Sequence, residues 1–167
     1  MTHEPRLTRE LRTLLKTQRV AALGTIDDIG APFVSMVPFA IEPQFHCPVI
    51  HVSGLAAHTR YVQARGMVSL MVMQSEVAGQ PVHALPRVTL EGVAKVAERG
   101  STEWAACRAA YLTRFPEAEP MTELGDFKFV AIKVTGARQV AGFGAARSLD
   151  QDEINVVLGP GEQPVGG

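Results

Sequence analysis

The order in which strand-like and helix-like segments follow one another is the strongest constraint on the fold of this chain. Short apolar or alternating runs recur along the 167 residues, and only two strong helical patterns are set between them. The regular strand–helix alternation that is typical of parallel sheets does not occur. Six or seven strands of this kind predict a mainly β fold: an antiparallel sheet of Greek-key type, curled into a barrel with helices packed outside.

The expected strands follow two patterns. Residues 32–41 are nearly all apolar, which is typical of a strand covered on both faces, although Pro38 indicates an edge or a bulge. Residues 87–97 alternate between apolar and polar side chains, as a half-buried antiparallel strand does. Residues 74–86 contain Gly and Pro and predict a loop long enough to be functional. Further strands are expected at 19–26, 48–53, 67–73 and 127–135, with 140–143 as a continuation.

Helical spacing of apolar residues marks the remaining elements. Leucines at i, i+4, i+7 and i+8 predict an amphipathic helix over 7–16, and an aromatic stripe predicts a helix over 101–115. A weaker helical pattern covers 55–65. A chain of this length fits one domain, which we expect to span residues 1–150. Residues 151–167 form a short C-terminal extension with a loose Gly/Pro-rich end.

Charge and composition exclude several classes of function. The formal net charge is −1, so no overall positive field attracts nucleic acid or an anionic membrane. No run has the length of a membrane span, and the N-terminus lacks the apolar core of a signal peptide. We therefore expect a cytoplasmic protein whose two cysteines, Cys47 and Cys107, stay reduced.

Common catalytic motifs are not found in the sequence. It contains no G-x-S-x-G, H-E-x-x-H, C-x-x-C or phosphate-binding P-loop, and its five histidines show no paired spacing typical of a metal site. Gly142-Phe143-Gly144 resembles the start of a dinucleotide fingerprint, but Arg147 stands where the third glycine is needed. We therefore predict no metal site and no Rossmann domain.

Polar residues at the ends of expected strands form the most suggestive pattern. They are Ser35, Ser53, His58, Thr59, Arg60 and Arg87. A helix start offers free backbone N–H groups, and guanidinium groups make charge-assisted bonds, so together they suit a phosphate. Each residue also has a structural explanation: a small core residue, a helix cap, a solvated charge or a partner for a carboxylate. No single residue decides between these interpretations.

Taken in order, several segments resemble the pyridoxamine 5'-phosphate oxidase-like superfamily of FMN-binding split barrels, and in particular its haem-utilisation branch. The segments are 30–39 (GAPFVSMVPF), 52–53 with 58–61 (HTRY), 67–72 (MVSLMV), 86–92 (PRVTLEG), 125–127 and 142–146 (GFGAA). The resemblance covers residues 15 to 149. It implies a homodimer with FMN at the subunit interface.

The resemblance also implies the site residues. Ser35, Met36 and Val37 are expected along the flavin ring and ribityl chain, and Ser53, His58, Thr59 and Arg60 around the phosphate. Arg87 is expected to contact the flavin and to favour its reduction, and Phe143 to reach the cofactor from the partner subunit. FMN would carry the redox step at its N5, while the protein supplies position and electrostatics.

The implied function is an FMN-dependent oxidoreductase that acts on a small molecule. One alternative is a non-enzymatic protein that stores, senses or carries flavin or haem, and another is a split barrel that binds a deazaflavin. The chain ends without the basic and aromatic signature of the pyridoxamine oxidases, which argues against vitamin B6 oxidation. The 167 residues also leave no room for the C-terminal domain of longer haem-utilisation proteins. We therefore do not expect this protein to bind or break down haem.

Overall fold

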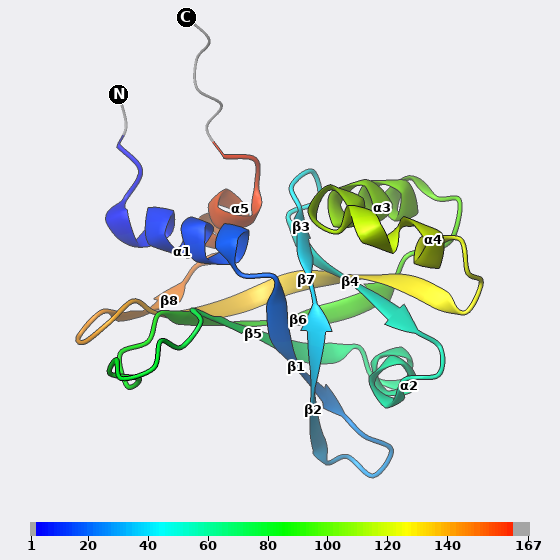
Figure 1. Ribbon diagram of the computed structural model, residues 1–167, viewed down its shortest axis with the longest axis horizontal. Helices are drawn as coiled ribbons and strands as arrows, with labels where there is room; N and C mark the ends of the chain where they lie inside the picture. The colour runs from blue at the N-terminus through cyan, green and yellow to red at the C-terminus, as the bar shows by residue number, and fades with distance from the viewer. Residues whose placement is uncertain (1–2, 162–167) are drawn as a thin grey trace, which may run out of the picture.

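The strands form one antiparallel sheet whose two ends curl toward each other (Figure 1). The computed structural model describes residues 3–161. Its strands are β1 (Val20–Ile26), β2 (Pro32–Pro38), β3 (Ala40–Glu42), β4 (Cys47–Ser53), β5 (Met67–Met73), β6 (Arg87–Val96), β7 (Phe127–Val140) and β8 (Ala146–Leu149). The strand order is β2-β1-β5-β6-β7-β4-β3, with β8 paired to β7. Since β2 also contacts β4, the sheet closes into a split barrel, which confirms the predicted fold.

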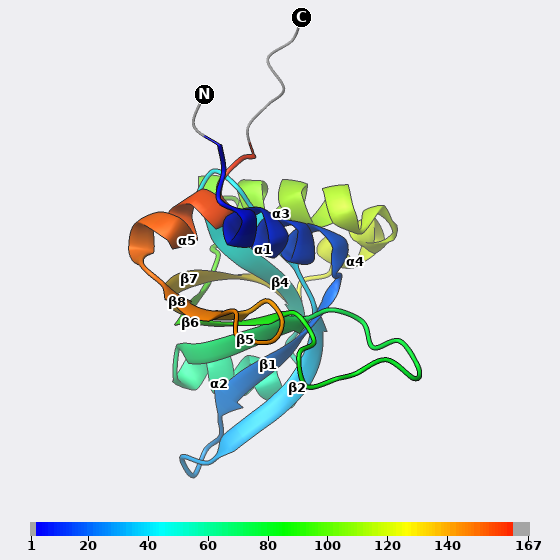
Figure 2. The same ribbon diagram turned by 90° about the vertical axis from the view of Figure 1, so that its left-hand side faces the viewer.

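Helices cover the outside of the barrel at three places (Figures 1 and 2). They are α1 (Arg6–Thr17), α2 (Ala57–Ala64), α3 (Thr102–Arg114), a 3-10 turn (Pro116–Ala118), α4 (Glu119–Thr122) and α5 (Gln151–Leu158). The expected leucine stripe of α1 is buried, and α1 packs against α5. The aromatic stripe of α3 covers β3, β4 and β7, and Ser101 caps its first turn through the Trp104 N–H.

The C-terminal extension begins as an ordered helix. An Asp150–Glu153 capping box starts α5, and Ile154, Val157 and Leu158 are buried in the main core. The predicted domain boundary at residue 150 therefore lies directly before a helix that packs on the barrel. The predicted loose end at residues 162–167 lies outside the described residues.

A bulge between the long strands β6 and β7 bends the sheet so that it can curl. The register shifts between Glu91 and Gly92, and Thr135 on β7 is left out of the pairing. Gly92 is required here because a Cβ at this position would overlap the Lys133 carbonyl. Gly136 lies at this bulge, opposite Glu91.

The apolar run at residues 32–41 differs from its expected form. It divides into the edge strand β2, which ends at Pro38, and the short strand β3. Val34 and Met36 point away from the barrel and are 67% and 65% exposed in a single chain. The expected cover on both faces is therefore not supplied by the chain itself.

Candidate functional site

Helix α2 bridges the gap of the split barrel between β2 and β4. On the β2 side, the ring of Tyr61 meets Phe33 edge-on at 5.2 Å between centroids. On the β4 side, Thr59 is buried and bonds the end of the strand at Ser53. We call the group Ser35, Ser53, His58, Thr59 and Arg60 the split corner. The structure thus brings five of the nine predicted site residues together within one chain.

Ser35 and His58 form a direct contact across the split. Ser35 pairs with the fully buried Leu23, so its side chain faces the barrel interior, and its Oγ lies 3.0 Å from His58 Nδ1. Desolvation by burial lowers the pKa of His58 below its ordinary value. The imidazole is therefore neutral at neutral pH and is held in a defined orientation.

Ser53 and Thr59 shape the start of α2. The Thr59 hydroxyl donates to the Ser53 carbonyl at 2.5 Å, while Ser53 Oγ accepts from the Leu55 N–H at 3.2 Å. The helix begins after Ala56, whose side chain offers no cap. The first turn of α2 consequently has no side-chain partner for its N–H groups, a feature that favours an anion there.

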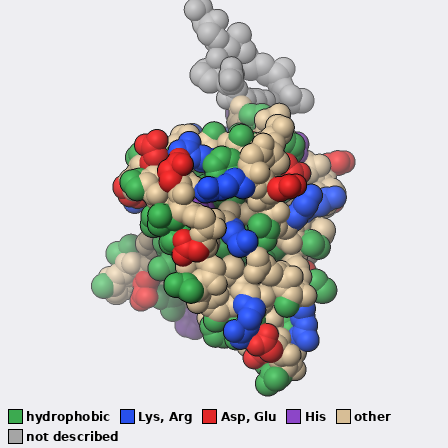
Figure 3. All heavy atoms as spheres, turned by 90° about the vertical axis from the view of Figure 1, so that its right-hand side faces the viewer, with side chains coloured by type: hydrophobic (Ala, Val, Ile, Leu, Met, Phe, Trp, Pro, Cys, Tyr) green, Lys and Arg blue, Asp and Glu red, His purple; other side chains and the backbone are tan. Residues whose placement is uncertain are grey.

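Arg60 projects from the split corner toward solvent. Its Nη2 lies 2.7 Å from Asp28 in the β1–β2 turn, and both side chains are exposed. The Asp28 hydrogen bond raises the pKa of Arg60 further. On the right-hand side of the molecule as drawn in Figure 1, acidic and basic side chains are interspersed (Figure 3). This face therefore presents no continuous basic patch for nucleic acid.

Met36 and Val37 lie on opposite faces of β2. Met36 points outward over a hollow of about 440 Å³ lined by β1, β2 and β5, whereas Val37 is buried in the barrel core. A ligand at the edge of β2 therefore meets the Val37 backbone but not its side chain. The side chains that line the hollow are uncharged and mostly apolar.

Arg87 and Phe143 lie far from the split corner of their own chain. α2 leads into β5 at Met67, whereas Arg87 pairs with Met73 at the other end of β5, about 20 Å away along the strand. Arg87 Nη1 donates to the carbonyls of His83 and Leu85, so it organises the 74–86 loop. Phe143 is 82% exposed beside that loop. These two predicted residues form a second group.

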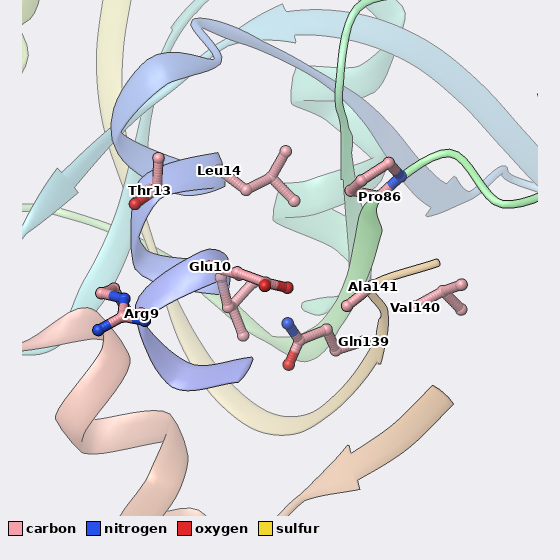
Figure 4. Close-up of a pocket in the computed structure, with 9 residues that line it drawn as sticks. Arg9, Glu10, Thr13, Leu14, Pro86, Gln139, Val140 and Ala141 are labelled. Carbon is pink, nitrogen blue, oxygen red and sulfur yellow. The ribbon is translucent and has the colours of Figure 1, made fainter. Parts of the chain in front are cut away.

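A further hollow, of about 280 Å³, lies between α1 and the ends of β6 and β7 (Figure 4). Leu14 and Pro86 extend from its opposite walls. The amide of Gln139 is buried there, donating to the Leu7 carbonyl and accepting from Arg147. Because this polar group is already paired within the chain, the hollow has the character of a packing defect and contains none of the predicted site residues.

Two residues that contact the split corner were not among the predicted site residues. They are Asp28, which bonds Arg60, and Tyr61, which belongs to the 58–61 segment of the family resemblance but was assigned no role. Within residues 3–161 no cluster of three or more His, Cys, Asp or Glu side chains is arranged to hold a metal ion. Over the same residues, no helix has both the length and the apolar character needed to cross a membrane.

Sequence comparison identifies the family. The profile described as pyridoxamine 5'-phosphate oxidase matches residues 7–141, which include every strand from β1 to β7 and the split corner. The chain belongs to the pyridoxamine 5'-phosphate oxidase family. The predicted resemblance is thereby confirmed.

Several of the proteins that are similar to this chain are named for haem. Over 150 residues the chain is 28% identical to the heme oxygenase HutZ of Vibrio cholerae, covering 89% of this chain and 84% of that protein. It is 32% identical over 139 residues to the chloroplastic heme oxygenase HOZ of Arabidopsis thaliana, covering 82% of this chain but only 41% of HOZ. A heme binding protein from Mycobacterium smegmatis superposes with a TM-score of 0.81 at 29% identity, covering 92% of this chain and 62% of that chain.

These relatives bear on the expectation drawn from chain length. HutZ is matched over most of its own length, so a family member named a heme oxygenase is of similar size to this chain. The length of this chain therefore does not argue against haem.

Proposed function

We propose that this protein binds haem at the split corner, as a homodimer, and acts on it in the manner of a haem oxygenase. The observation that carries the proposal is the similarity to HutZ over 89% of the chain, a stretch that includes the whole split barrel. Bound haem would supply an iron centre for dioxygen and electrons. The protein would supply position and the surrounding charge.

The side chains at the split corner suit haem chemically. His58 offers a neutral imidazole, a common ligand of haem iron. Arg60 is exposed and can exchange the Asp28 carboxylate for a carboxylate of the ligand. The Phe33–Tyr61 ring pair offers apolar surface beside them. A planar, largely apolar dianion thus finds a partner for each of its parts.

The outer face of the sheet supports a homodimer. Val34, Met36, Met67 and Val93 are exposed on this face, and the hollow lined by Met36 continues the apolar surface. Apolar patches of this kind usually mark interaction sites. We infer that a second copy covers this face and that the loop carrying Phe143 contacts the cofactor of the other chain.

Titration of the purified protein with ferric haem tests the proposal. We expect saturation at one haem per chain, with a shifted and sharpened Soret band. Incubation with ascorbate under oxygen should then bleach the Soret band, and with argon it should not. A Soret band that stays at the position of free haem throughout the titration would overturn haem binding.

FMN is the second candidate, and one observation favours it. The start of α2 lacks a side-chain cap and lies beside Arg60, Ser53 and Thr59, which is the arrangement expected for a phosphate. The function would then be an FMN-dependent oxidation or reduction of a small molecule, and a deazaflavin would occupy the same place. Mass spectrometry of the copurifying cofactor distinguishes the three: flavin without haem would favour this second candidate.

A further inference from the structure

A hollow of about 530 Å³ lies on the side of the barrel opposite α2 and β2, bordered by α1, β3, α3 and α5 (Figures 1 and 2). We call it the α1–α3 hollow. It is larger than the hollows of about 280 Å³ and 440 Å³ described above, and its volume falls within the range of about 300–1,000 Å³ that is usual for small-molecule sites. None of the nine predicted site residues lines it.

Apolar side chains from all four elements form the walls of the α1–α3 hollow. Leu15, Ala40 and Val157 are buried members of the packed core, while Ile41 and Ala110 are partly exposed. Burying a polar group against such walls costs free energy unless it finds a hydrogen-bond partner. A molecule that fills this hollow must therefore present mainly apolar surface.

The charged side chains that line the α1–α3 hollow are all cations. They are Arg12, Lys16 and Arg114, and no acidic side chain of residues 3–161 lines the hollow with them. Arg12 is paired with Glu4, which lies 2.8 Å from its Nη2. The chain as a whole has a formal net charge of −1, so this positive charge is a local feature. An anion in the hollow would be attracted by Lys16 and Arg114.

Lys16 and Arg114 differ in how they can act on an anion. Arg114 is held by four backbone carbonyls at 2.8 to 3.2 Å and, within the described part of the chain, forms no ion pair with a carboxylate. Burial, aided by the charge of Arg19, lowers the pKa of Arg114, and a nearby anion would stabilise its charged form. Lys16 is exposed, and its ammonium has no ion-pair partner among residues 3–161. Lys16 is therefore free to bind, and Arg114 supplies a fixed charge.

We propose that the α1–α3 hollow binds an apolar carboxylate, a molecule with one hydrocarbon chain and one carboxylate head. The hydrocarbon chain would pack among Leu15, Ile41 and Ala110, and Lys16 would bind the head at the rim. One free ammonium matches a head with one negative charge, and the apolar walls disfavour a ligand that is charged along its length. The inference is independent of the proposed haem function.

Calorimetric titration of the whole protein with decanoate, below the concentration at which micelles form, tests the proposal. We expect one decanoate per chain, weaker binding of decanol, which lacks the charge, and no measurable binding of butyrate, whose hydrocarbon chain is short. Lys16→Gln should weaken decanoate binding by about 2- to 5-fold, as loss of one exposed charge pair does. Lys95→Gln is the matched control, because Lys95 is exposed and lines a different hollow. Equal binding of decanoate and decanol, or equal affinity in the two variants, would overturn the proposed role of charge.

A second pair of variants locates the ligand. Ala110→Phe places a ring in the hollow and should abolish decanoate binding, whereas Ala105→Phe, at an exposed position of the same helix, should leave it unchanged. Photo-cross-linking with a diazirine-labelled decanoate needs no variant to fold, and it should mark α1, α3 or α5 of the wild-type protein. A wild-type protein that binds no decanoate, cross-links confined to α2 and β2, or full affinity in Ala110→Phe would overturn the site.

Discussion

His51 and His58 show how the surroundings of an imidazole decide its role. His58 lies where Ser35 fixes it, whereas the ring of His51 stacks on Phe127 at 5.1 Å and packs against Phe129 at 4.4 Å. Burial, aided by the charge of Arg99, lowers the pKa of His51 to about 4. His51 is thus a core residue with one unsatisfied nitrogen.

The burial of His51 predicts that the free energy of unfolding depends on pH. The unfolded chain protonates His51 near its ordinary pKa of 6.5, and the folded protein resists protonation down to about pH 4. The free energy of unfolding is therefore highest above pH 6.5. It falls as the pH drops toward 4, and the total loss is about 3 kcal/mol at most. Urea unfolding across this range should show the loss, and His51→Phe should flatten it. His83→Phe is the control, because His83 is exposed. If the free energy of unfolding of His51→Phe depends on pH as strongly as that of the wild type, the prediction is contradicted.

Single residues of the site were predictable to the extent that local pattern defines them. Ser35 was identifiable because a hydroxyl in an apolar strand needs a partner, and Ser53 and Thr59 because they flank a helix start. The partner of Ser35 was not identifiable, since it depends on how α2 crosses the split. Val37 was assigned to the cofactor by the family resemblance, although strand alternation turns its side chain into the core.

At the scale of elements, Arg114 joins three parts of the fold. From α3 it donates to the carbonyls of Leu15 and Lys16 at the end of α1, and also to those of Gln18 and Phe39. Its guanidinium also lies over the Phe39 ring, 5.0 Å from the centroid. It therefore satisfies carbonyls that the end of a helix leaves without partners.

Removing this guanidinium should cost stability. We expect Arg114→Ala to lower the free energy of unfolding by about 2 kcal/mol, because it leaves partly buried carbonyls unpaired. Thermal or urea denaturation measures the loss. Arg6→Ala is the matched control, since Arg6 forms only an exposed ion pair with Glu10 on α1 and should change stability by less than about 0.5 kcal/mol. Equal losses in both variants would contradict this role.

Most helices and strands were predictable because each has a clear periodicity. α1, α3 and the 74–86 loop lie where the leucine stripe, the aromatic stripe and the Gly/Pro residues indicated. One exception is the 32–41 run, where continuous apolar composition concealed the break between β2 and β3. A second is the strand expected at 140–143: β7 ends at Val140, a turn follows, and β8 was not predicted. An apolar side chain indicates that a residue is shielded from water. It does not indicate whether the same chain or a second chain shields it.

For the whole molecule, we propose that a second copy covers the exposed face of the sheet. Met36→Glu places a charge within the exposed apolar face and should convert a dimer into a monomer, as measured by light scattering after gel filtration. Ile29→Glu is the matched control, because Ile29 is 88% exposed in the β1–β2 turn and lies away from that face. A wild-type monomer, or a Met36→Glu protein that remains dimeric, would contradict this interface.

The dimer also bears on the two groups of predicted site residues. Arg87 pairs with Met73 at the end of β5, and Phe143 lies beside the 74–86 loop, so a single chain does not place these two residues in the split corner. The sequence predicted nine site residues, but it did not predict that they would lie in separate groups within one chain. If the dimer completes the site, the Met36→Glu protein should lose both dimerisation and haem affinity. The Ile29→Glu protein should keep both properties.

The position of the iron in crystals of the haem-loaded protein tests the central claim most directly. Anomalous scattering at the iron absorption edge should give one peak per chain at the split corner. A peak in the hollow between α1 and the ends of β6 and β7, or beside the 74–86 loop of the same chain, would contradict it.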